Sequence, residues 1–163
     1  MFSVGDKIVH PFHGAGVIQD IVDIEVLGEV KKYYTIALPF TKLKLDIPVD
    51  TAQNIGIRPV MRPEETEKLY EQLKKPLESQ DINWNRRHKE NLDKLRSGDI
   101  LQVAEVYKYL RIRDKKKSLS TGEKKLYSNS RNAIISEIIL STDSSQEEVM
   151  EKIDSIFKEC HNE

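Results

Sequence analysis

The residues with the clearest chemical character lie between Asn83 and Lys89, in the run Asn-Trp-Asn-Arg-Arg-His-Lys. This run contains Trp84, the only tryptophan among 163 residues. Asparagine caps helices because its side chain accepts a hydrogen bond from a free N–H group of the first turn. A helix that begins at Trp84 therefore carries a large ring at its end, followed within two turns by Arg86, Arg87 and Lys89. An apolar ring among cations suits a partner with phosphates outside and stacked bases inside, which is nucleic acid.

Helical spacing also allows the Trp84 ring to lie in the core instead of at the surface. One stripe of this helix would contain Trp84, His88, Leu92 and Leu95. The tryptophan would then be the first core residue of an amphipathic helix. Its position at the helix end, after the polar and loop-like segment 78–81, favours exposure instead. Spacing alone leaves both places open.

The formal net charge of −1 conceals an uneven distribution of charged residues. Residues 81–131 contain fourteen Lys and Arg against seven Asp and Glu, a net charge of +7. Residues 132–163 contain two against eight, a net charge of −6, and residues 1–63 are neutral. A basic block of this kind is expected of a surface that binds a polyanion, but lysines on a solvated helix give the same count.

The first 60 residues predict a small β domain. Five short extended segments are bounded by glycine and proline, at residues 4–10, 16–21, 22–26, 32–38 and 43–47. The last of them alternates apolar and polar residues with a period of two, which predicts one buried and one wet face. A flat sheet of this size would not cover its own core, so we expect a strongly bent, small barrel.

The segment 58–63 marks the predicted boundary, because its two prolines favour extended backbone and interrupt both strand and helix. After Pro63 the pattern predicts about five helices. Their expected starts are Pro63, Asn83, Asp99 with Gln102, Ser120 with Glu123, and Ser144 with Glu147. The predicted fold class is α+β with two domains: a β-barrel at residues 1–60 and a compact all-α domain at residues 61–163.

The sequence predicts no catalysis. Gly14-Ala15-Gly16 lacks the third glycine and the following helix of a phosphate-binding loop. His10 and His13 have the spacing of metal ligands, with no further ligand cluster beside them. Because no nucleophile, base and orienting group converge, we expect no catalytic residue, metal, cofactor or small-molecule substrate.

The pattern also favours a cytoplasmic monomer. No apolar run is long enough to span a membrane, and the N-terminal residues do not have the pattern of a secretory signal. The single cysteine, Cys160, fits a reducing compartment. Nothing in the pattern requires a dimer.

Residues 4–16 with Ile47-Pro48 form one block of the chain, and residues 83–92 form a second. Together the two blocks resemble the CarD/CdnL group of bacterial transcription regulators. The first block alone is the less specific one. Transcription-repair coupling factors share it in their RNA-polymerase-binding module, but they also carry helicase motifs that this chain lacks. The second block, residues 83–92, is similar to that family's Asn-Trp-x-Arg-Arg-x-Lys-x-Asn-Leu pattern. Further landmarks follow in order at residues 97–99, 103–106 and 119–124.

The resemblance implies a fold and a function. The first domain would be a Tudor-like barrel that docks on the β subunit of RNA polymerase. The second would meet promoter DNA at the upstream edge of the −10 element. There Trp84 would act as a wedge in the minor groove at the upstream fork of the transcription bubble and stabilise the open complex. The expected contacts to the DNA backbone are Arg86, Arg87, Lys89, Lys124, Lys125 and Arg131.

On the docking side, the expected residues lie on two neighbouring strands: Tyr33, Tyr34, Leu45, Asp46, Ile47 and Pro48. Asp46 is acidic where relatives often carry a basic or neutral residue. One alternative is an adaptor that binds polymerase without touching DNA, with Trp84 in the core. Another is an independent nucleic-acid binder that takes RNA through the barrel.

Overall fold

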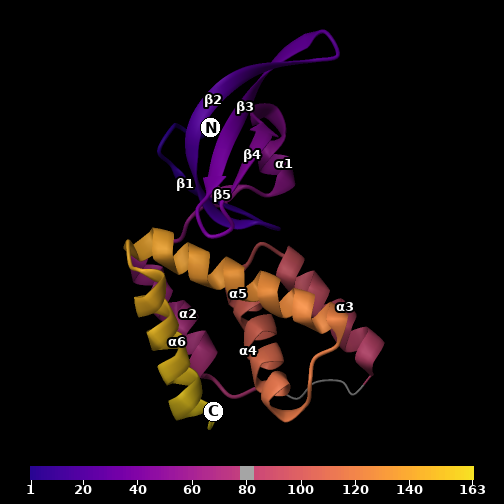
Figure 1. Cartoon of the computed structure of the whole chain (residues 1–163), viewed down its shortest axis with the longest axis vertical. Coiled ribbons are helices and arrows are strands. Elements are labelled where there is room, and N and C mark those ends of the chain that lie inside the picture. Colours follow the sequence, from indigo (N-terminus) through magenta and orange to yellow (C-terminus); the bar gives the residue numbers. More distant parts are fainter. Residues whose placement is uncertain (78–82) are drawn as a thin grey trace.

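The computed structural model describes residues 1–77 and 83–163, which form a sheet at one end and a group of helices at the other (Figure 1). We call residues 7–59 the sheet unit and residues 63–160 the helical unit. The polar loop expected at 78–81 lies outside the described residues. Among the helices that are described, none is long and apolar enough to cross a membrane.

The sheet unit is antiparallel, with the strand order β4-β3-β2-β1-β5. Its strands are β1 (Lys7–His10), β2 (Gly14–Val26), β3 (Glu29–Leu38), β4 (Leu43–Pro48) and β5 (Arg58–Pro59). The side chains that alternate inward form its core together with those of the short helix α1 (Ala52–Ile55) and the segment after it. The buried residues of that core are Ile8, Ile18, Tyr34, Ile36, Leu38, Ile47, Ala52 and Ile57.

The structure confirms a five-stranded unit but corrects its details. The two extended segments expected at 16–21 and 22–26 are one long strand, β2, whose pairing with β3 shifts at a bulge between Ile18 and Asp20. β5 lies in the segment expected to be a linker and pairs with β1. In the described chain β4 and β5 are the two edges, so the sheet is open and the closed barrel is not seen.

The helical unit contains the five expected helices, packed around a core of twenty buried residues. They are α2 (Thr66–Lys74), α3 (Trp84–Arg96), α4 (Ile100–Lys116), α5 (Thr121–Thr142) and α6 (Gln146–Cys160). The expected cap of α6 is wrong by one residue, because Ser145 rather than Ser144 accepts the first-turn hydrogen bond, from the Glu148 N–H. Asp99 caps α4 by accepting from the Leu101 N–H.

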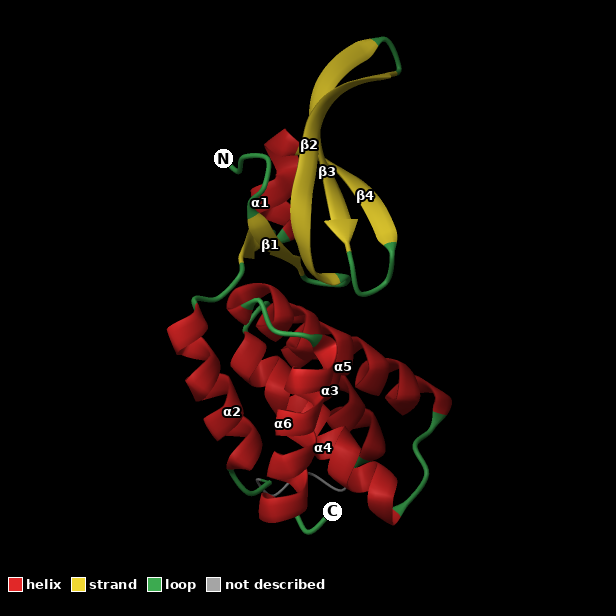
Figure 2. Cartoon of the chain, turned by 60° about the vertical axis from the view of Figure 1, so that its left-hand side comes forward, coloured by secondary structure: helices red, strands yellow, loops and turns green. Residues whose placement is uncertain are grey.

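α5 is the helix on which the sheet unit rests, as both views show (Figures 1 and 2). The Ala15 N–H of β2 donates to Ser136 Oγ of α5 over 3.0 Å. Gly14 has a φ of 81°, and a Cβ there would lie 2.8 Å from the same Oγ atom. The glycine therefore permits both the turn before β2 and the close approach of α5.

Candidate nucleic-acid interface

Asn83 begins α3 as the sequence predicts. Its backbone is extended, and its side-chain oxygen accepts a hydrogen bond from the Arg86 N–H over 3.2 Å. Trp84 is consequently the first helical residue, and 42% of its surface is exposed. The ring thus lies at a helix end and not within the core.

His88 covers one face of the indole. The two rings are nearly parallel, at 9°, with their centroids 4.8 Å apart. The first turn of α5 lies directly against His88, because a Cβ on Gly122 would come within 3.3 Å of His88 Cε1. A half-buried imidazole supported by α5 therefore holds the Trp84 ring in one orientation.

The buried stripe of α3 is not the one that starts at Trp84. Arg87, Asn91 and Leu95, spaced four residues apart, are the buried side chains of this helix. The alternative that places Trp84 in the core is wrong for this structure. Arg87, expected on the DNA-facing side, is only 8% exposed, and its guanidinium lies 5.6 Å from the centre of the Tyr109 ring. Arg87 therefore faces α4, which carries Tyr109.

The remaining expected cations divide into two groups. Arg86, Lys89, Lys124 and Lys125 are exposed on α3 and α5. Arg86 lies 3.4 Å from Glu90, and its side chain is 70% exposed, so this ion pair keeps the guanidinium at the surface. Arg131 is only partly exposed and contacts Met150 Sδ, 3.3 Å away on α6. It therefore faces α6, apart from the cations near the tryptophan.

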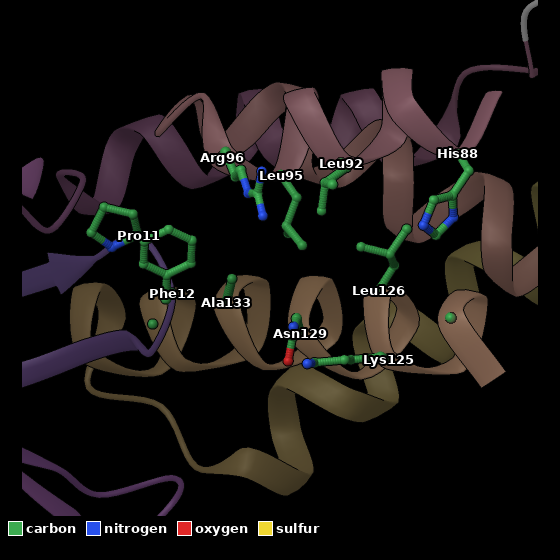
Figure 3. Close-up of a pocket in the computed structure, with 12 residues that line it drawn as sticks. Pro11, Phe12, His88, Leu92, Leu95, Arg96, Lys125, Leu126, Asn129 and Ala133 are labelled. Carbon is green, nitrogen blue, oxygen red and sulfur yellow. The ribbon is translucent and has the colours of Figure 1, made fainter. Parts of the chain in front are cut away.

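A hollow of about 250 Å³ separates α3 from α5 beside the Trp84–His88 stack (Figure 3). Leucines from both helices line it, with His88 at one end and Lys125 on its wall. At the other end lie Arg96 and Phe12, the latter 62% exposed in the turn between β1 and β2. No local pattern singles out Phe12 as a site residue, whereas Arg96 could have been found about two helical turns after His88.

The N-terminus of α5 is held by a buried carboxylate. Ser120 and Glu123 form the expected capping box, and Glu123 also lies 3.1 Å from the Arg113 guanidinium. Burial acts to raise the pKa of Glu123, but the hydrogen bonds from Ser120 and the charges of Arg113 and Arg87 outweigh it and lower that pKa overall. The turn that supports His88 is thus fixed by an ionised group.

The residues expected to dock on polymerase come together on β3 and β4. Tyr33 pairs with Pro48, and Tyr34 with Ile47. Tyr34 is buried and its hydroxyl accepts from the Phe2 N–H, so it supports the core and does not face outward. Thr35 Oγ1 donates to Asp46 Oδ1 over 2.7 Å on the exposed side. Leu45 is partly exposed on the edge strand. Elsewhere in residues 1–77 and 83–163, no three His, Cys, Asp or Glu side chains gather as a metal site.

Comparison with known families covers both units. Residues 2–61 match the CarD-like/TRCF RID domain, and residues 68–154 match the CarD C-terminal domain. The chain is 34% identical over 138 residues to YdeB of Bacillus subtilis (strain 168), whose name describes it as a transcription factor. That alignment covers 85% of this chain and 90% of the relative. The two matches together define a chain with a CarD-like/TRCF RID domain followed by a CarD C-terminal domain. The chain belongs to the CarD-like family.

Proposed function

We propose that this protein docks on the β subunit of bacterial RNA polymerase and stabilises the promoter open complex through Trp84. The family match of both units supports a role in transcription. The observation that carries the proposal is the half-exposed indole at the start of α3, stacked on His88 and flanked by exposed cations. The proposed domain limits are residues 1–60 for docking and residues 61–163 for DNA.

The wedge acts through a difference in affinity. A ring inserted in the minor groove unstacks a base step at a cost of roughly a few kcal/mol, which is smallest where the duplex is already opening. Trp84 then binds the upstream fork near the −10 element better than closed duplex, and this difference shifts the equilibrium toward the open complex. Because His88 already orients the ring, little conformational entropy is lost on insertion. No reaction is required.

The cations around the ring supply affinity without sequence preference. Arg86 and Lys89 follow Trp84 on α3, and Lys124 and Lys125 lie on the first turns of α5, next to His88. Contacts from such side chains to phosphates release counterions and make binding sensitive to salt. The buried Arg87 instead supports the helix that carries the ring.

Strand β4 is the proposed docking edge. It is paired on one side only, with β3, within the described chain. Pro48 has no N–H group, so its pair with Tyr33 is a pair without hydrogen bonds. Because such pairs alternate along an antiparallel ladder, the N–H groups of Asp46 and Lys44 point outward. An outward row of this kind can accept a further strand from a partner protein. We place the protein, as a monomer, on polymerase in the cytoplasm.

Trp84→Ala tests the wedge. Loss of a base–aromatic stack weakens binding by about 1–3 kcal/mol, so we expect the lifetime of the open complex to fall by about tenfold while polymerase is still bound. Trp84→Phe keeps a ring and is the matched control, with a smaller loss. Emission of Trp84, the only tryptophan, should also change when fork DNA is added. An unchanged lifetime with retained polymerase binding would favour the adaptor that does not contact DNA.

A further inference from the structure

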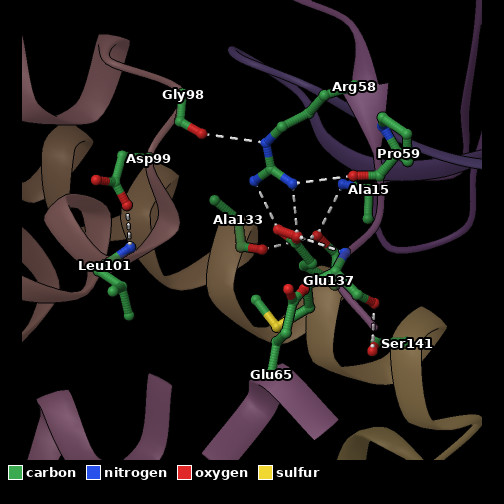
Figure 4. Close-up of polar contacts among 12 residues, drawn as sticks. Ala15, Arg58, Pro59, Glu65, Gly98, Asp99, Leu101, Ala133, Glu137 and Ser141 are labelled. Atoms are coloured by element: carbon green, nitrogen blue, oxygen red, sulfur yellow. Dashed lines mark hydrogen bonds and ion pairs between the residues drawn. The ribbon is translucent and has the colours of Figure 1, made fainter. Parts of the chain in front are cut away.

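An ion pair between Arg58 and the buried Glu137 joins the two units (Figure 4). Arg58 begins β5, and Glu137 lies in the C-terminal half of α5. Arg58 Nη1 donates to Glu137 Oε2 over 2.9 Å, and Nη2 donates to Oε1 over 2.7 Å. Glu137 is fully buried, whereas the Arg58 side chain is 30% exposed. Two parallel bonds between a guanidinium and a carboxylate fix orientation as well as distance.

The same guanidinium reaches a third element. Arg58 Nε donates to the Gly98 carbonyl over 3.1 Å. Gly98 lies in the turn between α3 and α4, where its φ is 77°. Arg58 therefore contacts the sheet unit, α5 and the end of α3, and the opposite end of α3 carries Trp84.

Further polar contacts at this boundary end on the same side of α5. Met61 donates its N–H to Glu137 Oε2 and accepts at its carbonyl from Ser141 Oγ, over 3.4 Å and 2.7 Å. Lys7 Nζ of β1 donates to the Leu140 carbonyl over 2.8 Å. Residues 136, 137, 140 and 141 form one stripe of the helix. Directional bonds thus define the angle between the units, unlike an apolar contact on which two surfaces can slide.

We propose that Arg58 is a positioning residue that fixes the angle between β4 and Trp84, and that stabilisation of the open complex needs this fixed angle. The inference rests on the proposed function. Two sites that contact one assembly at the same time bind best when their relative orientation is set beforehand. When the Arg58–Glu137 pair is loosened, each site keeps its own contact, but the two no longer reach their targets together.

Glu137→Gln is the main test variant. The amide has the shape of the carboxylate and leaves no buried charge behind, and Arg58 is exposed enough to be hydrated. Arg58→Lys keeps the positive charge but loses the two-pronged contact, so we expect an intermediate effect. Asp143→Asn is the matched control, because Asp143 pairs with Lys7 across the same boundary at 2.9 Å but is 83% exposed. Asparagine also tolerates its φ of 52°.

The angle is measured with two spin labels, one on the native Cys160, which is exposed, and one on Gln19→Cys in β2, also exposed. Pulsed dipolar spectroscopy should give a narrow distance distribution for the labelled parent and for Asp143→Asn. We expect a broader or shifted distribution for Glu137→Gln. An unchanged distribution in both Glu137→Gln and Arg58→Lys would overturn the proposal.

The functional part of the experiment uses the unlabelled full chain with polymerase and a promoter. For Glu137→Gln we expect polymerase affinity within about twofold of the parent and an open-complex lifetime shorter by about threefold to tenfold. If polymerase affinity falls together with the lifetime, the pair supports the fold of the sheet unit and the proposal is wrong. It is also wrong if the distribution broadens but the lifetime is kept.

Trp84→Ala is measured in the same lifetime assay to separate the two proposals. A normal lifetime in Trp84→Ala contradicts the proposed function, and the positioning role falls with it. A short lifetime in Trp84→Ala but not in Glu137→Gln contradicts the positioning role alone. If Glu137→Gln loses its cooperative unfolding transition, Arg58→Lys carries the test in its place.

Discussion

The sheet unit and the helical unit offer different kinds of groups to a partner. The sheet unit has an edge strand, β4, which within the described chain is paired on one side only. In the helical unit the main-chain N–H and C=O groups pair within each helix. The surface beside α3 therefore offers side chains to a partner, namely an indole and cations. Recognition through a strand edge depends mainly on geometry, whereas recognition through cations depends on salt. Under the proposed function, one chain would therefore combine a protein-binding and a nucleic-acid-binding chemistry in separate places.

The two units also differ in the size of their hydrophobic cores. The hydrophobic core of the sheet unit contains eight buried residues, and the core around which the helices pack contains twenty. A small unit buries a lower fraction of its surface and has less stability of its own. The polar contacts with α5 therefore matter more to the sheet unit than to the helices beneath it.

Lys44→Pro tests recognition through the strand edge of the sheet unit, and it has the largest expected effect. Proline removes an outward N–H group of β4 and places a ring at the edge, while the hydrogen bonds to β3 remain. We expect polymerase affinity to fall by about tenfold, from the lost hydrogen bond and the obstructing ring. Binding is followed by the anisotropy of a dye on Cys160.

Lys44→Gln is the control for the edge, because it removes the charge and keeps the N–H group. It should bind nearly as the parent does. Equal affinity of the proline and glutamine variants would contradict docking through β4.

Glu123→Gln tests how much the capped start of α5 stabilises the helical unit. This buried carboxylate caps α5 and pairs with Arg113, so we expect a loss of about 1 kcal/mol at neutral pH. Because folding lowers the pKa of Glu123 below its ordinary value of 4.5, its stabilisation is full above that value and is lost as the pH falls through the lower, folded pKa. Thermal unfolding of parent and variant should therefore converge in acid. Glu148→Gln, at the equivalent but exposed position of α6, is the control with a smaller loss.

Lys125→Ala has the smallest expected effect. If Lys125 contacts a phosphate, its removal should lower the slope of log affinity against log salt by about one, with a modest loss of affinity for fork DNA. Titration of the Trp84 emission at several salt concentrations gives the slope. Lys158→Ala removes an exposed lysine of α6 and should leave the slope unchanged. A slope that is the same in both variants would remove Lys125 from the proposed contacts.

Local chemistry made much of this architecture predictable. Asn83 and Ser120 cap the helices that they were expected to cap, because capping depends on the residue and its nearest neighbours. The period of two in residues 43–47 likewise identified β4. For Trp84 the sequence left two positions open, one exposed and one in the core, and the structure has the exposed one.

What could not be predicted depends on partners far along the chain. β5 is two residues long and is a strand only because β1 lies beside it. From the sequence alone, its proline indicated a linker. Arg87 looked like its exposed neighbours, and only the packing of α3 on α4 buries it against Tyr109. The Arg58–Glu137 pair joins residues 79 positions apart, and nothing in the local sequence of either one indicates the other.

That separation also has a consequence for synthesis. Domains generally fold as units, the N-terminal one first, while the chain is being made. The sheet can therefore form on the ribosome while the Arg58 side chain is still hydrated, because Glu137 is added 79 residues later. The angle between the two units is then set in a late step of maturation, after α5 has been made.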